Sequence, residues 1–531
     1  MRTLALALVV AFAGGACSHG GARPETTFEG GPAALGSACA RLLDDGGPAS
    51  AWVRFDGAGQ LHYRALDEHD DHIMDFSHAG YGGGGVALPA VATAVTVTPS
   101  GGDDTAAIQA ALDAVAARPL SAGVRGAVEL AAGTFTVSAQ LSLRASGVVL
   151  RGRGAGGGGT EVRMTGNPHL FLSMAGAGTT VPDGTETTIA DPYVPSGARS
   201  FSVLDASGLR PGDEVLVRRP VTESWVRFMG MDTLVRNGTP QTWLATGTRI
   251  AADRVVREVH GKTITLDVPL SDSYDARYTT PPGATVGKYT FPGRITQVGL
   301  EGLRVSAPVV SSSIRGGLFT LLRADAVMDG WVRDVAATDT ENSITLGQTV
   351  KRFTIQDLSI RRTGSVDASA GYPMEVQLLG TQILVQRAAI EGNDLYTYGT
   401  GARVSGPNVI LACTARGTHT RLEPHARWAT GFLADGVVHD DMLDLVNRRT
   451  AGSGHGWAIG WGVLWNCAGS RVDVQRPPGA MNWAIGCKGA PAGDGTFDSP
   501  GQPVTPRSLY LAQLCARLGP EALARIGWPS R

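Results

Sequence analysis

Histidine, arginine and tryptophan residues are concentrated between residues 417 and 487 of the chain. Four of the 11 histidines fall there, with arginines and tryptophans around them. These residue types suit the cleavage of a uronate-containing polysaccharide by β-elimination. That reaction removes the proton at C5 of the uronate, so a cation must neutralise the carboxylate while a base takes the proton. The stretch therefore predicts a site that acts on an acidic glycan.

Each residue type has its own expected role in such a site. Histidine can act as base or acid near neutral pH, and arginine binds a carboxylate through two parallel hydrogen bonds. Tryptophan offers a flat face on which a sugar ring can stack. The predicted catalytic residues are His425, Arg427, Arg448 and His455. The predicted substrate-binding residues are Arg421, Glu423, Trp428, Trp457, Asn482 and Trp483.

Structural explanations compete with these roles. His455 stands between glycines and suits a turn, and Arg427 with Trp428 suits a cation–π pair at a corner. A hydrolase would need two carboxylates instead of this cluster. The acidic candidates for that role, which turn or surface positions explain more simply, are Asp394, Asp440, Asp441 and Asp444.

The composition favours an elongated repeat over several compact domains. The chain has 531 residues, of which 72 are glycine and only 18% are charged. Short apolar runs recur at roughly 20 to 30 residues from residue 295 onward, the spacing of stacked structural repeats. Each repeat alone cannot bury its apolar face, so stacking must supply the core. The runs are 295–298, 303–305, 331–335, 353–355, 383–385 and 409–411.

A helix and two glycine-bounded strands come before these runs. Residues 106–117 are alanine-rich with apolar residues at helical spacing, and Asp104 or Thr105 suits the N-cap. The strands follow at residues 126–133 and 147–152. This order is typical of a parallel β-helix whose first coil is covered by a helix, because an open end would expose unpaired edge groups.

The segments 103–112, 126–135 and 147–152 together resemble the pectate-lyase-like superfamily of β-helix proteins. The resemblance is specific over residues 99–165 and architectural over 295–490. It implies an all-β fold, a right-handed single-stranded parallel β-helix. The superfamily includes polysaccharide lyases, glycoside hydrolases of the polygalacturonase type, and phage-tail and epimerase relatives, so it specifies fold better than chemistry.

The chain departs from two patterns of that superfamily. It has no convincing polygalacturonase-type pair of adjacent aspartates in a strand, and no spaced aspartates like the calcium site of pectate lyases. The cofactor is therefore left unknown, with calcium as the candidate. The run Glu-His-Asp-Asp-His at 68–72 has metal-binding residue types, but a solvated loop explains it better.

Seven segments are expected along the chain. A turn and strand at 209–217 and a hairpin at 259–267 indicate an inserted β subdomain, whose Trp225 and Trp243 are placed over the sugar groove. An amphipathic helix at 508–526 is expected to close the far end of the β-helix. The segments are a signal peptide (1–17), a linker (18–38), an N-terminal segment (39–98), the β-helix start with its capping helix (99–189), the inserted β subdomain (190–290), the rungs with the groove (291–490) and the C-terminal tail and helix (491–531).

The first 17 residues have the pattern of an export signal, with Arg2 before an apolar run too short to span a bilayer. Cys17 suits either lipidation or ordinary cleavage, so we expect a secreted or cell-envelope protein that meets a membrane only through a lipid on Cys17. Export permits disulfides. Five later cysteines remain, and Cys467 and Cys487 are predicted either to bridge or to stack in the core.

The charge of the chain bears on its partners. A net charge of -2 provides no broad basic field, so nucleic acid is not expected as a partner. We expect a monomer that binds an acidic polysaccharide. The favoured function is a polysaccharide lyase, and the alternatives are a glycoside hydrolase with paired carboxylates and a non-catalytic glycan-binding β-helix.

Overall fold

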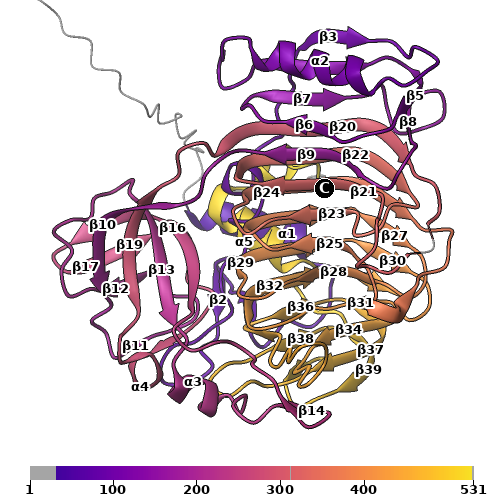
Figure 1. Cartoon of the computed structure of the whole chain (residues 1–531). Coiled ribbons are helices and arrows are strands. Elements are labelled where there is room, and N and C mark those ends of the chain that lie inside the picture. Colours follow the sequence, from indigo (N-terminus) through magenta and orange to yellow (C-terminus); the bar gives the residue numbers. More distant parts are fainter. Residues whose placement is uncertain (1–31, 311, 529–531) are drawn as a thin grey trace, which may run out of the picture.

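The computed structural model describes residues 32–310 and 312–528 (Figure 1). The predicted signal peptide and Cys17 lie outside the described residues. The described chain forms a right-handed parallel β-helix, with an antiparallel subdomain at its side and a few short helices (Figure 1). This confirms the predicted fold class. None of the helices in the described ranges is long and apolar enough to cross a membrane.

The β-helix has three faces, and its 28 strands join in one sheet through parallel pairing. The first face contains β3 (Thr93–Val97), β4 (Gly126–Leu130), β7 (Val148–Arg151), β20 (Ile295–Ser306), β22 (Val327–Thr338), β24 (Lys351–Arg361), β26 (Thr381–Gln386), β29 (Ser405–Leu411), β32 (Ala429–Asp435), β35 (Ile459–Gly460), β36 (Val463–Trp465), β38 (Trp483–Ile485) and β40 (Thr496–Asp498). The second contains β5 (Gly133–Val137), β8 (Thr160–Met164), the ends of β20, β22 and β24, then β27 (Ala389–Glu391), β30 (Thr414–Arg416) and β33 (Val438–His439). The third contains β6 (Leu141–Leu143), β9 (Leu170–Ala175), β21 (Thr320–Asp325), β23 (Ile344–Leu346), β25 (Met374–Leu378), β28 (Tyr396–Thr400), β31 (Arg421–Leu422) and β34 (Met442–Leu445), and β37 (Ala468–Val474) and β39 (Lys488–Ala492) join the second and third faces.

The core is built by stacking one apolar residue per coil into columns. Val385 of β26 pairs with Ile410 of β29, which pairs with Ala434 of β32 and then Leu464 of β36. All four side chains are fully buried in one core. The predicted apolar runs therefore form strands because each strand buries its inward side chains only when the next coil covers them.

Helix α2 (Thr105–Ala116) covers the open end of the first coil, as predicted. Its Ile108, Leu112 and Val115 are buried in the core of the β-helix. The first coil begins earlier than expected from the sequence, because β3 starts at Thr93 and pairs with β4. Asp104 links helix and coil, since its carboxylate accepts hydrogen bonds from the backbone N–H groups of Ser100 and Thr136.

The inserted subdomain is an antiparallel sheet of six strands between β9 and β20, at the left in Figure 1. The hairpin predicted at 259–267 is formed by β16 and β17, with His260 opposite Thr263. The carboxylate of Asp253, in β16, lies 2.6 Å from Lys351 Nζ and 3.3 Å from Arg294 Nη2, and these ion pairs tie the subdomain to the β-helix. Its strands are β10 (Val181–Thr188), β12 (Ser200–Ser202), β13 (Glu214–Pro220), β16 (Arg249–His260), β17 (Thr263–Leu266) and β19 (Thr285–Thr290). Beside them lie β11 (Tyr193–Val194), β18 (Tyr274–Asp275), β14 (Val235–Arg236), β15 (Thr239–Pro240), α3 (Glu223–Phe228) and α4 (Ala276–Thr279).

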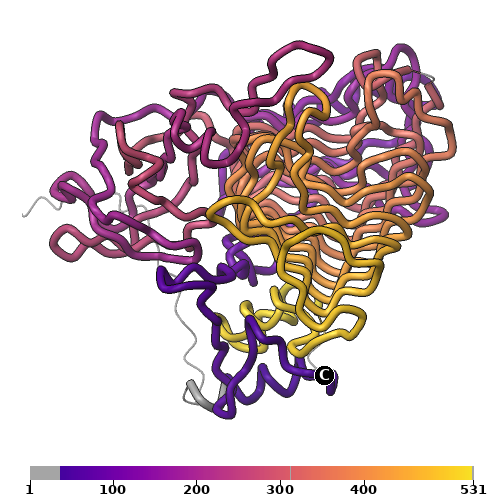
Figure 2. The backbone as a smooth tube through the Cα atoms, turned by 90° about the horizontal axis from the view of Figure 1, so that it is seen from below, coloured from indigo at the N-terminus to yellow at the C-terminus, as the bar shows by residue number. Residues whose placement is uncertain are grey.

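The C-terminal helices do not close the far end of the β-helix, which corrects the expectation from the sequence. Helices α5 (Leu509–Leu518) and α6 (Glu521–Arg525) lie beside α1 (Pro32–Leu43) at the side of the β-helix (Figure 2). They pack against the first face, where Leu384, Val409 and Leu433 meet them in one apolar cluster. Helix α1 begins at residue 32, within the stretch expected to be a linker. The N-terminal segment also contains the hairpin β1 (Val53–Phe55) with β2 (Leu61–Tyr63), and short 3-10 turns lie at Tyr81–Gly83 and Ala368–Ala370.

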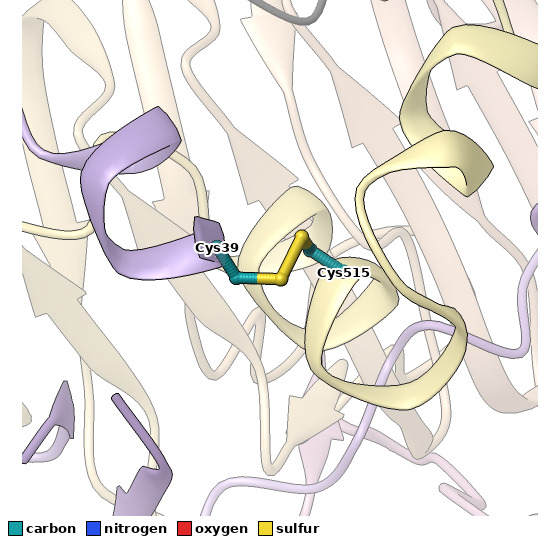
Figure 3. The surroundings of a disulfide bond; sticks show 2 residues. All are labelled: Cys39 and Cys515. Atoms are coloured by element: carbon teal, nitrogen blue, oxygen red, sulfur yellow. A yellow bond between two sulfur atoms is a disulfide. The ribbon is translucent and has the colours of Figure 1, made fainter. Parts of the chain in front are cut away.

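The disulfide bond differs from the predicted one. Cys39 of α1 is bonded to Cys515 of α5 (Figure 3). Cys467 and Cys487 are free and buried, as is Cys413, and all three belong to the core of the β-helix. The pair therefore takes its alternative predicted role, as stacked core residues.

Candidate functional site

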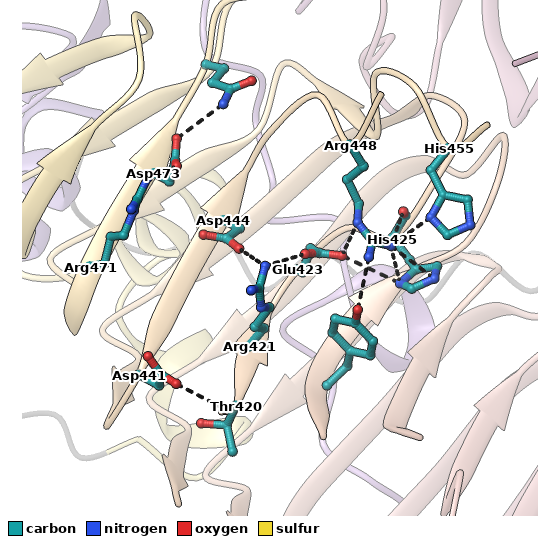
Figure 4. Close-up of polar contacts among 12 residues, drawn as sticks. Thr420, Arg421, Glu423, His425, Asp441, Asp444, Arg448, His455, Arg471 and Asp473 are labelled. Carbon is teal, nitrogen blue, oxygen red and sulfur yellow. Dashed lines mark hydrogen bonds and ion pairs between the residues drawn. The ribbon is translucent and has the colours of Figure 1, made fainter. Parts of the chain in front are cut away.

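Three successive coils of the third face carry an acidic residue at the same position. Leu422, Leu443 and Val472 are paired in register and are buried in the core. The residue after each of them, which points the opposite way in an extended strand, is acidic. We call this set, which is Glu423, Asp444 and Asp473, the carboxylate stack (Figure 4). Neighbouring strands lie about 4.8 Å apart, so its carboxyl groups are brought close together.

Arginine side chains bind every member of the carboxylate stack (Figure 4). Arg421 lies between two coils, with Nη1 3.2 Å from Asp444 Oδ2 and 3.7 Å from Glu423 Oε2. Arg471 lies 2.6 Å from Asp473. Arg421 and Arg471 are themselves partly exposed, with 39% and 52% of their side-chain surface accessible. They present positive charge to a ligand that approaches the third face.

Asp444 has the titration behaviour of a proton donor. Only 4% of its side-chain surface is exposed. Burial and the negative charge of Glu423 raise the pKa of Asp444 to about 7, against the opposing effect of Arg421. Asp444 therefore carries a proton over part of the neutral range, which an ordinary surface aspartate does not.

Arg448 connects the carboxylate stack to two histidines and a tyrosine. Its Nε lies 2.9 Å from Glu423 Oε1, and Nη2 donates to the Tyr396 hydroxyl at 2.9 Å. Its Nη1 lies 3.0 Å from the His425 carbonyl and 2.8 Å from His455 Nδ1. Since a guanidinium only donates, His455 Nδ1 accepts and Nε2 carries the proton. Five of the predicted residues, Arg421, Glu423, His425, Arg448 and His455, are thus brought together.

The positive charge of this group affects His455 directly. Burial, and then the charge of Arg448, lower the pKa of His455 to about 3. The imidazole of His455 is therefore neutral near pH 7, and its Nδ1 accepts a hydrogen bond from Arg448.

A pocket of about 340 Å³ opens beside this group on the third face. Tyr396 and His425 form one wall, and their rings meet edge to face with centroids 5.0 Å apart. The remaining lining residues come from earlier coils of the same face and from nearby loops, and they include Asn342, Tyr372, Met374, Gln377 and Gly401.

The predicted sugar-stacking role of the tryptophans is wrong. Trp428, Trp457 and Trp483 are at most 8% exposed. The indole of Trp428 donates to Asp272, and that of Trp457 donates to the backbone of residue 229, so both bind the inserted subdomain. Trp225 and Trp243 of that subdomain, which were placed over the groove, are 1% exposed. All five pack where the subdomain and the N-terminal segment dock on the β-helix.

Asn482 is a structural residue as well, which corrects its predicted role in substrate binding. It is fully buried. Its carbonyl oxygen accepts from the backbone N–H of Gly462 at 2.8 Å, and its amide donates to the carbonyls of Gln475 and Ile459 at 2.9 and 3.3 Å. One side chain thus satisfies three backbone groups at a corner of the last coils.

We expect Asn482→Ala to lower the free energy of unfolding by about 1–3 kcal/mol, because buried backbone groups lose their only side-chain partner. Urea unfolding followed by circular dichroism measures the change. Asn167→Ala is the matched control: Asn167 is exposed, so its replacement should change stability by less than about 0.5 kcal/mol. Equal effects of the two variants would contradict the structural role of Asn482.

The side chains of some residues of the predicted region bind elsewhere. Arg427 directs Nη2 to the carbonyl and hydroxyl of Ser453 at 2.8 Å, while its backbone N–H donates to the His455 carbonyl at 3.0 Å. His419 is largely exposed and binds Asp394. Only Arg421 and Leu422 of residues 419–427 form a strand.

Several residues of the site were missed from the sequence. Tyr396, Arg471 and Asp473 were not considered, whereas Asp444 was named as a candidate hydrolase carboxylate for which a turn or surface position was the simpler explanation. A repeated pattern could have revealed the stack, because an aliphatic residue followed by an acid recurs as Leu422-Glu423, Leu443-Asp444 and Val472-Asp473. In the described ranges, no group of three or more histidine, cysteine, aspartate or glutamate side chains is placed to hold a metal ion.

Comparison with known proteins gives structural neighbours alone. No protein-family model and no curated protein sequence matches the chain. Among solved structures, the tailspike of Acinetobacter baumannii bacteriophage AP22, in complex with a capsular saccharide, is 12% identical with a TM-score of 0.37, and the match covers 75% of this chain and 56% of the tailspike. The tailspike of E. coli bacteriophage HK620, in complex with a pentasaccharide, is 9% identical with a TM-score of 0.41, covering 87% of this chain and 70% of the other. The chain thus spans little more than half the length of the AP22 tailspike, and these likenesses concern the fold alone.

Proposed function

We propose that the protein hydrolyses glycosidic bonds of an acidic polysaccharide on the third face of the β-helix. The observation that carries the proposal is the in-register carboxylate stack, in which Asp444 and Asp473 follow one another on adjacent coils. Retaining glycosidases hold an acid and a nucleophile about 5–5.5 Å apart, close to the spacing of neighbouring strands, about 4.8 Å.

The two residues divide the chemistry according to their surroundings. Asp473, the more exposed of the pair, attacks the anomeric carbon while Asp444 gives its proton to the departing glycosidic oxygen. The resulting glycosyl ester on Asp473 is then hydrolysed by water, whose proton returns to Asp444. Both carboxyl groups end the cycle as they began it.

The arginines of the site are the reason why we propose an acidic substrate. Arg421 covers Asp444, and its Nη1 lies 3.2 Å from Asp444 Oδ2 and 3.7 Å from Glu423 Oε2. A uronate carboxylate of the substrate that formed an ion pair with Arg421 would draw the guanidinium away from Asp444. The proton of Asp444 would then be accessible to the glycosidic oxygen. Arg471, on the same face and half exposed, offers a second contact of the same kind.

β-Elimination is the second candidate, and one observation favours it: His425 and Tyr396 both line the pocket of about 340 Å³. A lyase would use His425 as the base, with a cation on the substrate carboxylate. Arg448 is poorly placed to neutralise the substrate carboxylate, because it is already bound to Glu423 and its side chain is only 13% exposed. This difference is why hydrolysis is preferred.

One experiment separates the candidate functions. Purified protein is incubated with a panel of acidic and neutral polysaccharides, with and without calcium. Reducing ends and the ultraviolet absorbance of unsaturated uronate are followed together. We expect reducing ends without new absorbance on an acidic polymer. Absorbance that is lost in His425→Ala would establish the lyase instead, and binding without either signal would identify a non-catalytic glycan-binding protein.

We also propose that the protein acts outside the cytoplasm, in the cell envelope or after secretion. The disulfide between Cys39 and Cys515 supports this, because such bonds persist in oxidising compartments. A fusion to a reporter that is active only after export would test the location.

A further inference from the structure

A second pocket, of about 140 Å³, lies where three parts of the chain meet. The N-terminal segment contributes residues 66–71, the inserted subdomain contributes residues between 193 and 278, and the β-helix contributes Trp428, Trp461 and residues 476–480. It has no lining residue in common with the pocket beside Tyr396.

The floor of this junction pocket is a buried charged network. Asp272 accepts hydrogen bonds from Arg219 Nη1 at 3.0 Å, from Trp428 Nε1 at 3.0 Å and from Trp461 Nε1 at 3.2 Å. The guanidinium of Arg219 lies over the ring of Trp225 at 4.2 Å. These contacts fix the guanidinium in place at the bottom of the pocket.

One donor of this network is left unsatisfied. Arg219 is 4% exposed, and its Nε has no hydrogen-bond partner in the part of the chain that the structure describes. A buried donor without a partner is costly, and native structures rarely keep one unless a ligand or water completes it. Arg219 is one of the residues that line the junction pocket.

The walls are aromatic. Phe228 and Tyr278 stack with centroids 4.1 Å apart and planes 18° apart, and His69 stacks on Tyr193 at 4.3 Å. Phe228, Tyr193 and Tyr278 are half-buried, and His69 is exposed. Flat rings above a polar floor suit a ligand with one apolar face and several hydroxyl groups.

The charge around the junction pocket argues against an anion. Four acidic side chains line it, against three arginines. Two of the acids are paired, Asp272 with Arg219 and Asp275 with Arg277. Asp71 is held by Tyr193 and by the backbone N–H of Ser196. The pocket therefore offers both donors and acceptors without a net positive charge.

We propose that the junction pocket binds one neutral pyranose ring of a glycan. The ring would stack against the Phe228–Tyr278 pair, and its hydroxyl oxygens would reach Arg219 Nε and the carboxyl of Asp71. Binding at this pocket is independent of the hydrolysis proposed above. It would hold the glycan to the protein at a second place, which the inserted subdomain creates by docking on the β-helix.

The test uses the full chain and four separate sugars: glucose, galactose, N-acetylglucosamine and galacturonate. Saturation-transfer NMR and tryptophan fluorescence report binding. We expect at least one neutral sugar to bind in the millimolar range. Tyr278→Ala and Phe228→Ala should each weaken it at least tenfold. Tyr372→Ala, a half-buried tyrosine in the other pocket, and Asp444→Asn should leave the affinity unchanged.

The proposal is overturned by either of two results. These are no binding of the neutral sugars, whether or not galacturonate binds, and binding that survives both aromatic variants. Circular dichroism checks that the variants are folded. If Tyr278→Ala does not fold, Phe228→Ala alone decides the test. Because Asp444→Asn keeps the junction pocket intact, loss of hydrolysis and loss of sugar binding are separate outcomes.

Discussion

Asp444→Asn is expected to lower kcat/KM for polysaccharide hydrolysis by about 10²- to 10⁴-fold, the usual contribution of a general acid. The amide has nearly the same shape but cannot supply a proton to the departing oxygen. Asp444 lies at the centre of the carboxylate stack, and the change also removes the negative charge that its ionised form presents to Arg421. Reducing-end assays on the polymer identified in the screen measure the effect.

The pH dependence gives a second readout of the same residue. The pKa of Asp444 is raised to about 7, so the acid is protonated below that pH and loses its proton above it. Activity of the unmodified protein should therefore fall about tenfold per pH unit on the alkaline side of about pH 7. The residual activity of Asp444→Asn should lack this fall.

Asp441→Asn is the matched control. Asp441 precedes the same strand but lies at the coil corner, where it accepts from the Thr420 N–H at 3.2 Å (Figure 4). It also accepts from the Ser470 hydroxyl at 3.2 Å. It should retain activity within a factor of about three. If Asp444→Asn keeps more than about a tenth of the activity, Asp444 is not the acid.

The fold was predictable because its signals are local. Each apolar run needs only the next coil to bury it, so short runs with glycine, asparagine and aspartate corners indicate a β-helix wherever they repeat. The capping helix is equally local, because Ile108, Leu112 and Val115 show its buried face in a single stretch of sequence.

The candidate site was predictable only in part, because its members meet through stacking. Glu423, His425, Arg448 and His455 were singled out by residue type and do lie together. The tryptophans were misassigned because nothing near Trp428 in the sequence shows that Asp272, 156 residues away, covers it. Asp473 was missed because its partner on the previous coil becomes visible only once the register is known.

The disulfide is the most distant link of all, and its loss should have the largest effect on stability. It joins residues 476 apart, and the cost of closing a loop in the unfolded chain grows with loop length. Replacing both Cys39 and Cys515 by alanine should lower the free energy of unfolding by about 4 kcal/mol. Guanidinium unfolding under non-reducing conditions measures the change, and unmodified protein unfolded with a reductant should reproduce it.

The structure also predicts what the double replacement leaves intact. Helices α1 and α5 pack on the first face of the β-helix, whereas the carboxylate stack lies on the third. Without the bond, hydrogen bonds still join the two ends of the chain: Arg507 N–H donates to the Leu43 carbonyl at 2.9 Å, Thr505 N–H to the Pro48 carbonyl at 2.8 Å, and Ser50 N–H to the Thr505 carbonyl at 3.1 Å. Hydrolysis at 25 °C should therefore stay within a factor of about two of the unmodified protein, while resistance to protease at the N-terminus falls. A loss of activity equal to that of Asp444→Asn would mean that the terminal helices support the third face, and an unchanged unfolding midpoint would mean that packing alone holds α1 in place.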